Sequence, residues 1–313
     1  MKYFLVIFFS VFAQAVFSQT IHLKNGKVLN GAIIERTSEY IRVNFNGVPL
    51  KYYLEDIAAI NEDAPASDLL IEEKTASNDK EFSEGLKFIS QQRYWEAIEI
   101  LKKAVDINPI DSKAMYNVAS TYFMLGSYDD AIEWYKKALT IDDKYVNAYI
   151  GLGLAYRFVV KYPDSINFLQ KAIDIEPNNV LALTEMGLCY QMMEEYDLAA
   201  KWYEKVVNIN PNNDKVYHFL GMTYGRIGDW QKAIESFKAA ISINPYYADA
   251  YFFLGTTIAS WETTKARENS VVADFNKALP ALEKAKELYG NDDNAEQLQK
   301  VDDFIVRITG GGE

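Results

Sequence analysis

The side chains that carry most enzyme and metal chemistry are scarce in this sequence. It contains two histidines, His22 and His218, and one cysteine, Cys189. Neither histidine has further ligands at the spacing of a zinc site, or a nucleophile beside it as in a catalytic pair. The sequence has no glycine-rich phosphate loop and no Gly-x-Ser-x-Gly turn. We therefore expect no catalytic residue, no cofactor and no metal.

Neighbouring acids are the other candidates for acid–base chemistry. Asp129 and Asp130 form one pair, and Glu194 and Glu195 form another. Both pairs fall beside expected helix turns, where capping and solvation favour carboxylates. An enzyme that uses such a pair is the less favoured hypothesis, and we interpret these acids as helix ends.

The charge of the chain limits its partners. The net charge is −12, and the excess of acids lies after residue 60. Nucleic acids and anionic lipids are bound largely through basic patches. The sequence therefore argues against both as partners. No segment after residue 18 is apolar over the length that a membrane span needs.

A repeat of about 34 residues organises most of the chain. Pro177, Pro211 and Pro245 follow one another at one constant spacing, and Pro109 stands two periods before Pro177. Other residue types recur in the same period: Tyr122, Tyr156, Tyr190 and Tyr224; Gly85, Gly153, Gly187, Gly221 and Gly255, with Ala119 in the one gap; and Ala97, Ala131, Ala199 and Ala233, with Ser165 in the one gap. Such a period is typical of arrays in which each unit covers one face of its neighbour.

Each unit has the pattern of two amphipathic helices. In residues 214–247, one apolar stripe follows helical spacing at Tyr217, Leu220, Gly221 and Tyr224, and a second at Ala233, Ile234, Phe237, Ala240 and Ile241. Gly228 permits a positive φ between the stripes, and Asp229 caps the second helix. Asn244 before Pro245 ends that helix, because the proline ring disfavours a helical conformation for the preceding residue.

The small residues of the period have an expected packing role. We predict that they lie where two helices cross closely, with small residues facing each other and large ones around them. Leucine in place of Gly221 should then separate the helices. Cys189 shares its position in the period with Thr121, Ala155 and Thr223. This position takes small side chains, so we expect a buried and unreactive thiol.

The stretch Tyr217-x2-Leu220-Gly221-x2-Tyr224, followed by Ala233-x3-Phe237 and Pro245, resembles the tetratricopeptide repeat. Tyrosine replaces the usual tryptophan, and Glu81, Glu84 and Ser165 depart from the pattern. The resemblance implies a mainly α protein, an α-solenoid of about six helix pairs with a C-terminal capping helix. The first five pairs are expected at residues 78–111, 112–145, 146–179, 180–213 and 214–247.

The sixth unit, residues 248–290, breaks the period. It begins regularly with Tyr251, Leu254 and Gly255. The period then requires alanines at positions 267 and 274, whereas they occur later, as Ala278 and Ala285. About three further helical turns, or a loop around residues 263–270, would absorb this insertion. Pro280 then has to lie near the start of the second helix. A one-sided apolar pattern predicts the capping helix at residues 294–308, before a flexible tail at residues 309–313.

The chain before residue 78 has a different character. Residues 1–18 form an apolar run after Lys2, which predicts a secretory signal peptide and export to the periplasm or the cell exterior. Residues 19–60 alternate around Asn25-Gly26 and Asn46-Gly47, a pattern that predicts a small all-β barrel-like domain. Leu23 to Gly31 resembles an Sm-like barrel, without its RNA-binding residues. Residues 61–77 are expected to form an acidic linker, with a short docking helix as an alternative around Leu69.

The resemblance also implies a site. In tetratricopeptide-repeat proteins, the first helix of each pair lines a concave groove. The corresponding residues here are Phe82, Leu86, Tyr116, Ser120, Ile150, Leu154, Arg157, Thr184, Leu188, His218, Met222, Phe252 and Thr256. Most are apolar, which favours a protein or peptide partner with an apolar or aromatic segment. The alternative is that neighbouring helices or the linker cover them. Gly151 and other non-polar residues at clamp positions argue against the carboxylate clamp of some family members.

These observations predict an exported scaffold or adaptor that binds a partner polypeptide and turns over no substrate. Two other readings stay open. The chain could be an accessory or regulatory subunit of an envelope enzyme or secretion complex, which co-purification with one catalytic protein would favour. It could also bind cell-wall glycan, given its 22 tyrosines.

Overall fold

The structure, a computed structural model, describes residues 19–23, 28–36, 40–45, 48–53, 57–60, 71–291 and 294–310, with side chains from residue 80 onward. The predicted signal peptide and residues 61–70 of the predicted linker lie outside this part. The chain divides into two compact units, Met1–Ala148 and Tyr149–Glu313.

The described residues of the first unit include five short strands. They are β1 (Gln19–Leu23), β2 (Val28–Arg36), β3 (Tyr40–Phe45), β4 (Val48–Tyr53) and β5 (Ile57–Ile60). All pairings are antiparallel, in the order β4-β3-β2-β1-β5. The Asn-Gly pairs at residues 25–26 and 46–47, where the alternating pattern predicts hairpin turns, lie outside the described residues. Closure of the sheet into a barrel stays a prediction.

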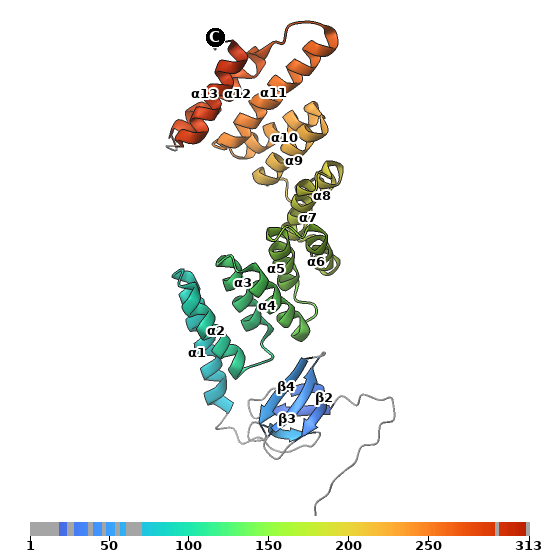
Figure 1. Cartoon of the computed structure of the whole chain (residues 1–313), viewed down its shortest axis with the longest axis vertical. Coiled ribbons are helices and arrows are strands. Elements are labelled where there is room, and N and C mark those ends of the chain that lie inside the picture. Colours follow the sequence, from blue (N-terminus) through green and yellow to red (C-terminus); the bar gives the residue numbers. More distant parts are fainter. Residues whose placement is uncertain are drawn as a thin grey trace, which may run out of the picture. The chain divides into compact units, whose positions relative to one another are not determined.

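Two complete helix pairs follow in the first unit (Figure 1). They are α1 (Ile71–Ser90) with α2 (Tyr94–Ile107), and α3 (Ser112–Met124) with α4 (Tyr128–Ile141). The helix α1 begins before residue 78, the expected start of the first repeat. Residues 71–77, which the sequence assigned to the linker, are therefore helical.

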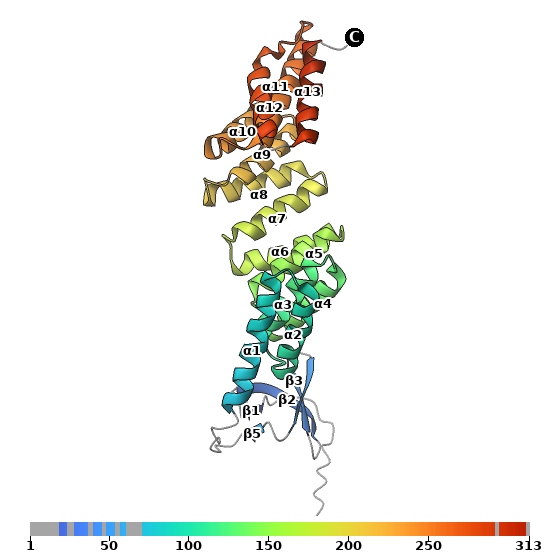
Figure 2. The ribbon, with the colours of Figure 1, turned by 90° about the vertical axis from the view of Figure 1, so that its left-hand side faces the viewer.

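The helix α5 (Val146–Phe158) crosses the boundary between the two units. The second unit then contains α6 (Tyr162–Ile175), α7 (Val180–Met192), α8 (Tyr196–Ile209), α9 (Asp214–Ile227) and α10 (Trp230–Ile243). Figure 2 shows α7 to α10 as successive layers of helix. Every second helix from α2 to α10 starts one full period after the previous one, which confirms the repeat.

The glycine column marks the tightest contact inside each pair. A Cβ atom built on Gly221 would lie 2.8 Å from the ring of Phe237, and one on Gly187 would lie 2.5 Å from Tyr203. Gly85 meets Leu101 in the same way at 2.6 Å. The glycines therefore face large side chains of the second helix. We expected small residues to face each other at this point, and that expectation was wrong, because each of these glycines meets a large side chain.

The turn between the two helices of a pair contains one residue with a left-handed backbone. The residues with this conformation are Gln92, Gly126, Val160, Glu194 and Gly228, and their φ angles lie between 59° and 88°. The period therefore fixes a backbone conformation at this position, although only two of these residues are the glycine that adopts it without strain.

Capping residues determine where the helices begin. Asp229 accepts a hydrogen bond from the backbone nitrogen of Lys232, and Asn213 accepts one from Val216. Asn244, directly after α10, donates from its side chain to Asp214 at the start of α9, over 3.0 Å. The corners predicted from the Asn-Pro pattern thus bond to each other as well as ending and starting helices.

The sixth repeat absorbs its insertion mainly as helix. The first helix α11 (Ala248–Asn269) has 22 residues, whereas α9 has 14. A short 3-10 turn, η2 (Phe275–Lys277), leads into α12 (Leu279–Asn291), so that Pro280 lies in the first turn as required. The helix α13 (Ala295–Thr309) forms the cap.

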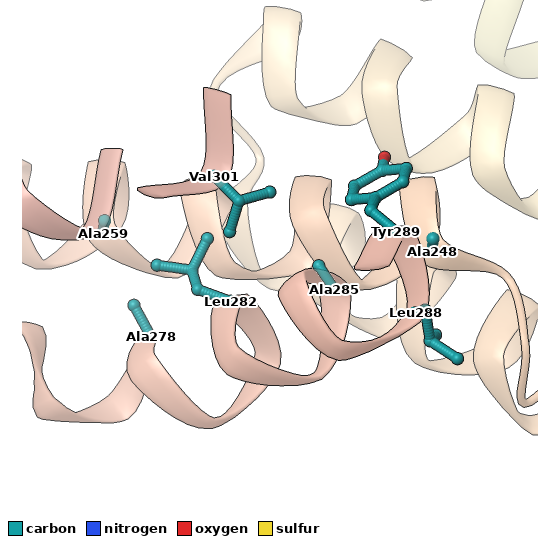
Figure 3. Close-up of a cluster of buried hydrophobic side chains, with 8 residues drawn as sticks. All are labelled: Ala248, Ala259, Ala278, Leu282, Ala285, Leu288, Tyr289 and Val301. Atoms are coloured by element: carbon teal, nitrogen blue, oxygen red, sulfur yellow. The ribbon is translucent and has the colours of Figure 1, made fainter. Parts of the chain in front are cut away.

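A small apolar core joins α11, α12 and α13. Leu282 and Val301 are fully buried and lie beside each other in Figure 3. Ala248, Ala259, Ala278, Ala285, Leu288 and Tyr289 complete the cluster. The ion pair between Lys286 and Asp302 adds a second link between α12 and α13. The cap predicted from the one-sided pattern of α13 is therefore packed on the last repeat.

Candidate binding site on the first helices

The predicted groove residues of the first unit lie on α1 and α3. Leu86 is 40% exposed, whereas Phe82, Tyr116 and Ser120 are half-buried. All four side chains are therefore at least partly accessible on the two first helices.

Tyr116 and Ser120 belong to a tyrosine cluster. The ring centroid of Tyr116 lies 5.6 Å from that of Tyr135 and 5.1 Å from that of Tyr145. The hydroxyl groups of Ser120 and Tyr135 are 3.1 Å apart. Burial raises the pKa of Tyr135, and it raises the pKa of Tyr145 to about 12. Both phenols therefore stay protonated near neutral pH, so the cluster is aromatic and uncharged.

In the second unit, Arg157 is engaged within the protein. Its Nε donates to a carboxylate oxygen of Glu185 on α7 over 2.8 Å, and both side chains are mostly buried. Burial raises the pKa of Glu185, while the Arg157 guanidinium acts in the opposite direction. Because its charge is paired with Glu185, Arg157 is poorly placed to bind a partner's carboxylate, in agreement with the sequence argument against a carboxylate clamp.

Two predicted groove residues are instead part of the core. Ile150 is 4% exposed and His218 is 5% exposed. His218 lies among aromatic rings, with centroids 5.0 Å from Tyr247, 5.3 Å from Phe253 and 5.6 Å from Phe237. For His218 the reason is that Tyr247 and Phe253, which belong to the end of the fifth repeat and to the sixth, pack against its ring. A partner cannot reach these two side chains, so they leave the predicted set.

The remaining predicted residues of the second unit are half-buried. They are Leu154 on α5, Thr184 and Leu188 on α7, Met222 on α9, and Phe252 and Thr256 on α11. Phe252 packs edge to face against Phe304 of α13, with 6.3 Å between ring centroids, and therefore serves the C-terminal cap. Met222 and Thr256 lie together at a pocket.

This pocket has a volume of about 550 Å³ and lies between α7, α9 and α11. Beside Met222 and Thr256, its walls include Met192, Arg226 and Trp230. Met192 is 50% exposed. Tyr196, Phe253 and Ser260 also line the pocket. The charged residues of the lining are Glu194 and Arg226. We call this the α9 pocket.

Sequence reasoning missed Met192, Arg226 and Trp230. It followed one stripe along the first helices, whereas Met192 and Arg226 come from the last helical turns and Trp230 begins a second helix. The turn between the helices brings these ends to the same pocket. A signal was present in the sequence, because residues next to the Gly228 turn are large and apolar or charged.

The chemistry-bearing residues are either buried or scattered in the described part of the chain. Cys189 is buried with its sulfur 3.1 Å from the Ser165 hydroxyl, and burial raises the pKa of its thiol. The expected buried position of Cys189 is thus confirmed. Over the same residues, no cluster of three or more potential metal ligands is found. No helix among them combines the length and apolar character of a membrane span.

Comparison with models of known protein families supports the interpretation of the period of about 34 residues as a tetratricopeptide repeat. Models described as tetratricopeptide repeat match residues 100–133 and 178–245, and one described as TPR repeat matches residues 119–157. The chain therefore carries tetratricopeptide repeats. No curated protein matches it in sequence.

Solved structures show the same fold. The C-terminal part of a TPR repeat-containing protein from Cytophaga hutchinsonii aligns with a TM-score of 0.61 at 18% identity, over 73% of this chain and 88% of its own. PilF from Pseudomonas aeruginosa aligns with a TM-score of 0.57 at 18% identity, over 72% and 98%. MamA is 28% identical over 55% of this chain and 94% of its own, with a TM-score of 0.50. The mainly helical repeat fold is thus shared with all three.

Proposed function

We propose that this protein is a scaffold that binds a partner polypeptide on its first helices, with the α9 pocket as the anchor. Its likeness to other tetratricopeptide-repeat proteins supports a role in protein–protein interaction. The proposed role needs neither catalysis nor a cofactor. It also rests on chemistry that this chain itself presents.

The α9 pocket is the observation that carries the proposal. It combines methionine, tryptophan, tyrosine and arginine, the types enriched at the centres of protein interfaces. Methionine is unbranched and polarisable, so Met192 and Met222 adapt to apolar side chains of different shape. Arg226 and Glu194 offer hydrogen bonds to the backbone or polar groups beside such a side chain.

The chemistry of the pocket defines the partner segment. Its volume of about 550 Å³ exceeds that of a single large side chain. We infer that it accepts an aromatic or long aliphatic residue together with its immediate neighbours. An extended or helical segment would then continue along α5 and α7, where Leu154 and Leu188 are partly exposed.

Selection from a library of displayed random peptides tests the proposal. The selected peptides should share an aromatic or large aliphatic residue, and Met192→Glu or Met222→Glu should weaken their binding about tenfold or more, because a carboxylate would be buried in the pocket. Met193→Glu is the matched control, since Met193 is exposed but does not line the pocket.

Two outcomes would contradict the proposal. One is a set of peptides without any apolar consensus. The other is equal weakening by Met193→Glu and Met192→Glu, which would indicate a general charge effect. Circular dichroism of each variant has to show the helical signal of the parent chain.

We further infer that the protein is exported by residues 1–18. The apolar run after Lys2 supports this inference. Fusion of these residues to a phosphatase that is active only outside the cytoplasm tests it. Activity of the fusion is expected, and an inactive fusion would argue against export.

A further inference from the structure

A second pocket is confined to the sixth repeat and its predecessor. It has a volume of about 590 Å³ and lies between α10, α11 and α12. Its apolar floor comes from Ile234 of α10 and from Leu254 and Ile258 of α11. We call it the insertion pocket. Its lining shares no residue with that of the α9 pocket.

The insertion creates one wall of this pocket. A first helix of the regular length, 14 residues as in α9, would end at Trp261, so Glu262 and Lys265 belong to the extension of α11. The late start of α12 brings Lys277 and Pro280 to the same place. The pocket is therefore built by the residues that break an otherwise constant period.

The apolar floor is surrounded by more positively charged than negatively charged side chains. Lysines supply three ammonium groups, from Lys238, Lys265 and Lys277, and glutamates supply two carboxylates, from Glu235 and Glu262. The lining therefore carries one excess positive charge, although the whole chain carries −12. Against this acidic background, an excess of positive charge favours an anionic ligand.

Glu262 holds two of these lysines at the pocket. It is only 8% exposed, and the same oxygen, Oε1, lies 3.1 Å from Nζ of Lys277 and 3.3 Å from Nζ of Lys265. Hydrogen bonding to the two lysines lowers the pKa of Glu262. Lys265 Nζ also lies 3.5 Å from the ring centroid of Trp261. The ammonium groups are thus positioned before any ligand arrives.

We propose that the insertion pocket binds a small carboxylate with an apolar body. The apolar body would lie on Ile234, Leu254 and Ile258, and the carboxylate would share the ammonium groups of Lys277 and Lys265 with Glu262. The volume is within the range of small-molecule sites, about 300–1,000 Å³. This site is independent of the polypeptide site proposed for the first helices.

Titration calorimetry of the full chain with octanoate tests the proposal. Octanoate binds at one saturable site, and octylammonium, which has the same apolar length and the opposite charge, binds at least tenfold more weakly. Lys277→Gln weakens octanoate binding about tenfold, since a hydrogen bond to a charged group is lost. Glu262→Gln has the opposite effect and tightens binding severalfold, because its amide oxygen can still accept hydrogen bonds from the two lysines but no longer competes with the ligand as a negative charge.

A matched control separates the pocket from lysine–tryptophan pairs in general. Lys205 Nζ lies 3.8 Å from the ring centroid of Trp202 on α8, away from the insertion pocket. Lys205→Gln should leave octanoate affinity unchanged. Circular dichroism confirms that each variant keeps its helical signal.

Three results would overturn the proposal. They are the absence of saturable octanoate binding, equal affinity for octanoate and octylammonium, and an unchanged affinity in both Lys277→Gln and Glu262→Gln. Each can occur while peptide binding at the α9 pocket persists, so failure here is distinguishable from failure of the proposed function.

Discussion

The fifth and sixth repeats form the same close contact between their two helices, although their first helices differ in length. The first helix has 14 residues in the fifth repeat and 22 in the sixth. Gly221 nevertheless meets Phe237 in the fifth, as Gly255 meets Leu282 in the sixth. A Cβ atom on either glycine would lie less than 3 Å from the opposing side chain. The contact inside the helix pair is therefore kept, although a longer stretch of chain joins its two sides in the sixth repeat.

The difference shows which part of a repeat tolerates change. The insertion lengthens α11 and the connection after it, where the backbone can extend into solvent. It leaves the glycine contact and the apolar cluster around Leu282 in place. What the insertion adds is one wall of the pocket between α10, α11 and α12, with Glu262, Lys265 and Lys277.

The largest effect is expected from substitutions that disrupt the glycine contact present in both repeats. Gly221→Leu places a side chain against Phe237, where a Cβ alone would already be 2.8 Å away, and should lower the unfolding free energy by about 3 kcal/mol or more. Gly255→Leu should cost a similar amount, because a Cβ on Gly255 would lie 2.6 Å from Leu282. Urea unfolding followed by circular dichroism measures both.

Gly225→Ala is the matched control for this comparison. A Cβ on Gly225 has no neighbour within 4 Å, so the substitution should stabilise α9 by about 0.5–1 kcal/mol. Equal effects of Gly221→Ala and Gly225→Ala would contradict the close contact with Phe237.

Deleting residues 263–273 should convert the sixth repeat into a copy of the fifth. Asp274 would then stand at the position of Asp229, and Ala278 at that of Ala233. We expect a folded chain whose unfolding free energy changes by about 1–2 kcal/mol, because the main contacts of α12 remain available. Octanoate binding should disappear with Lys265 and the wall of the insertion pocket. Loss of cooperative unfolding would show that the extension itself holds the C-terminal repeat together.

The pH dependence of stability should also distinguish the two repeats. His218 and Phe252 occupy the same position in the period. Burial lowers the pKa of His218 below its ordinary value of 6.5, against the opposing effect of Asp249. Below pH 6.5 the unfolded chain takes up a proton that the folded chain takes up only at lower pH, so stability falls as the pH drops.

His218→Phe should remove this part of the pH dependence. Thermal unfolding between about pH 7.5 and pH 5 compares the two chains, and the effect should be smaller than that of Gly221→Leu. An unchanged profile in His218→Phe would show that carboxylates elsewhere cause the acid sensitivity.

The smallest effect concerns the turns that follow the first helices. Gly228 and Ser270 both have a left-handed backbone, with φ angles of 88° and 53°. Ser270→Gly should stabilise the sixth repeat by less than about 1 kcal/mol, whereas Gly228→Ala should destabilise the fifth by about 1 kcal/mol. Melting temperatures of the two variants should therefore move in opposite directions.

Much of the helical fold could be predicted from the sequence, because the period repeats the same local signals. Gly228, Asp229 and the Asn-Pro corners mark helix ends by backbone chemistry alone. The conformation of the inserted residues could not be chosen, since helix and loop both fit their composition. Whether Gly221 meets a small or a large side chain depended on the relative rotation of two helices, which the period leaves open.

The site was less predictable than the fold. Met222 and Thr256 were found because they follow the first-helix stripe. His218 and Ile150 follow the same stripe but are buried, which a one-dimensional pattern cannot show. Trp230 and Met192 reach the α9 pocket from helix ends, so only the turn geometry brings them together.

Site-specific photo-cross-linking tests the central claim most directly. A photoreactive phenylalanine at position 222, in the α9 pocket, should cross-link to one polypeptide in the cells that make the protein. The same residue at position 201, which is exposed on α8 and outside the pocket, should not. A cross-linked peptide that contains an aromatic or long aliphatic residue would support the scaffold. No adduct from position 222, or the same adduct from both positions, would contradict it.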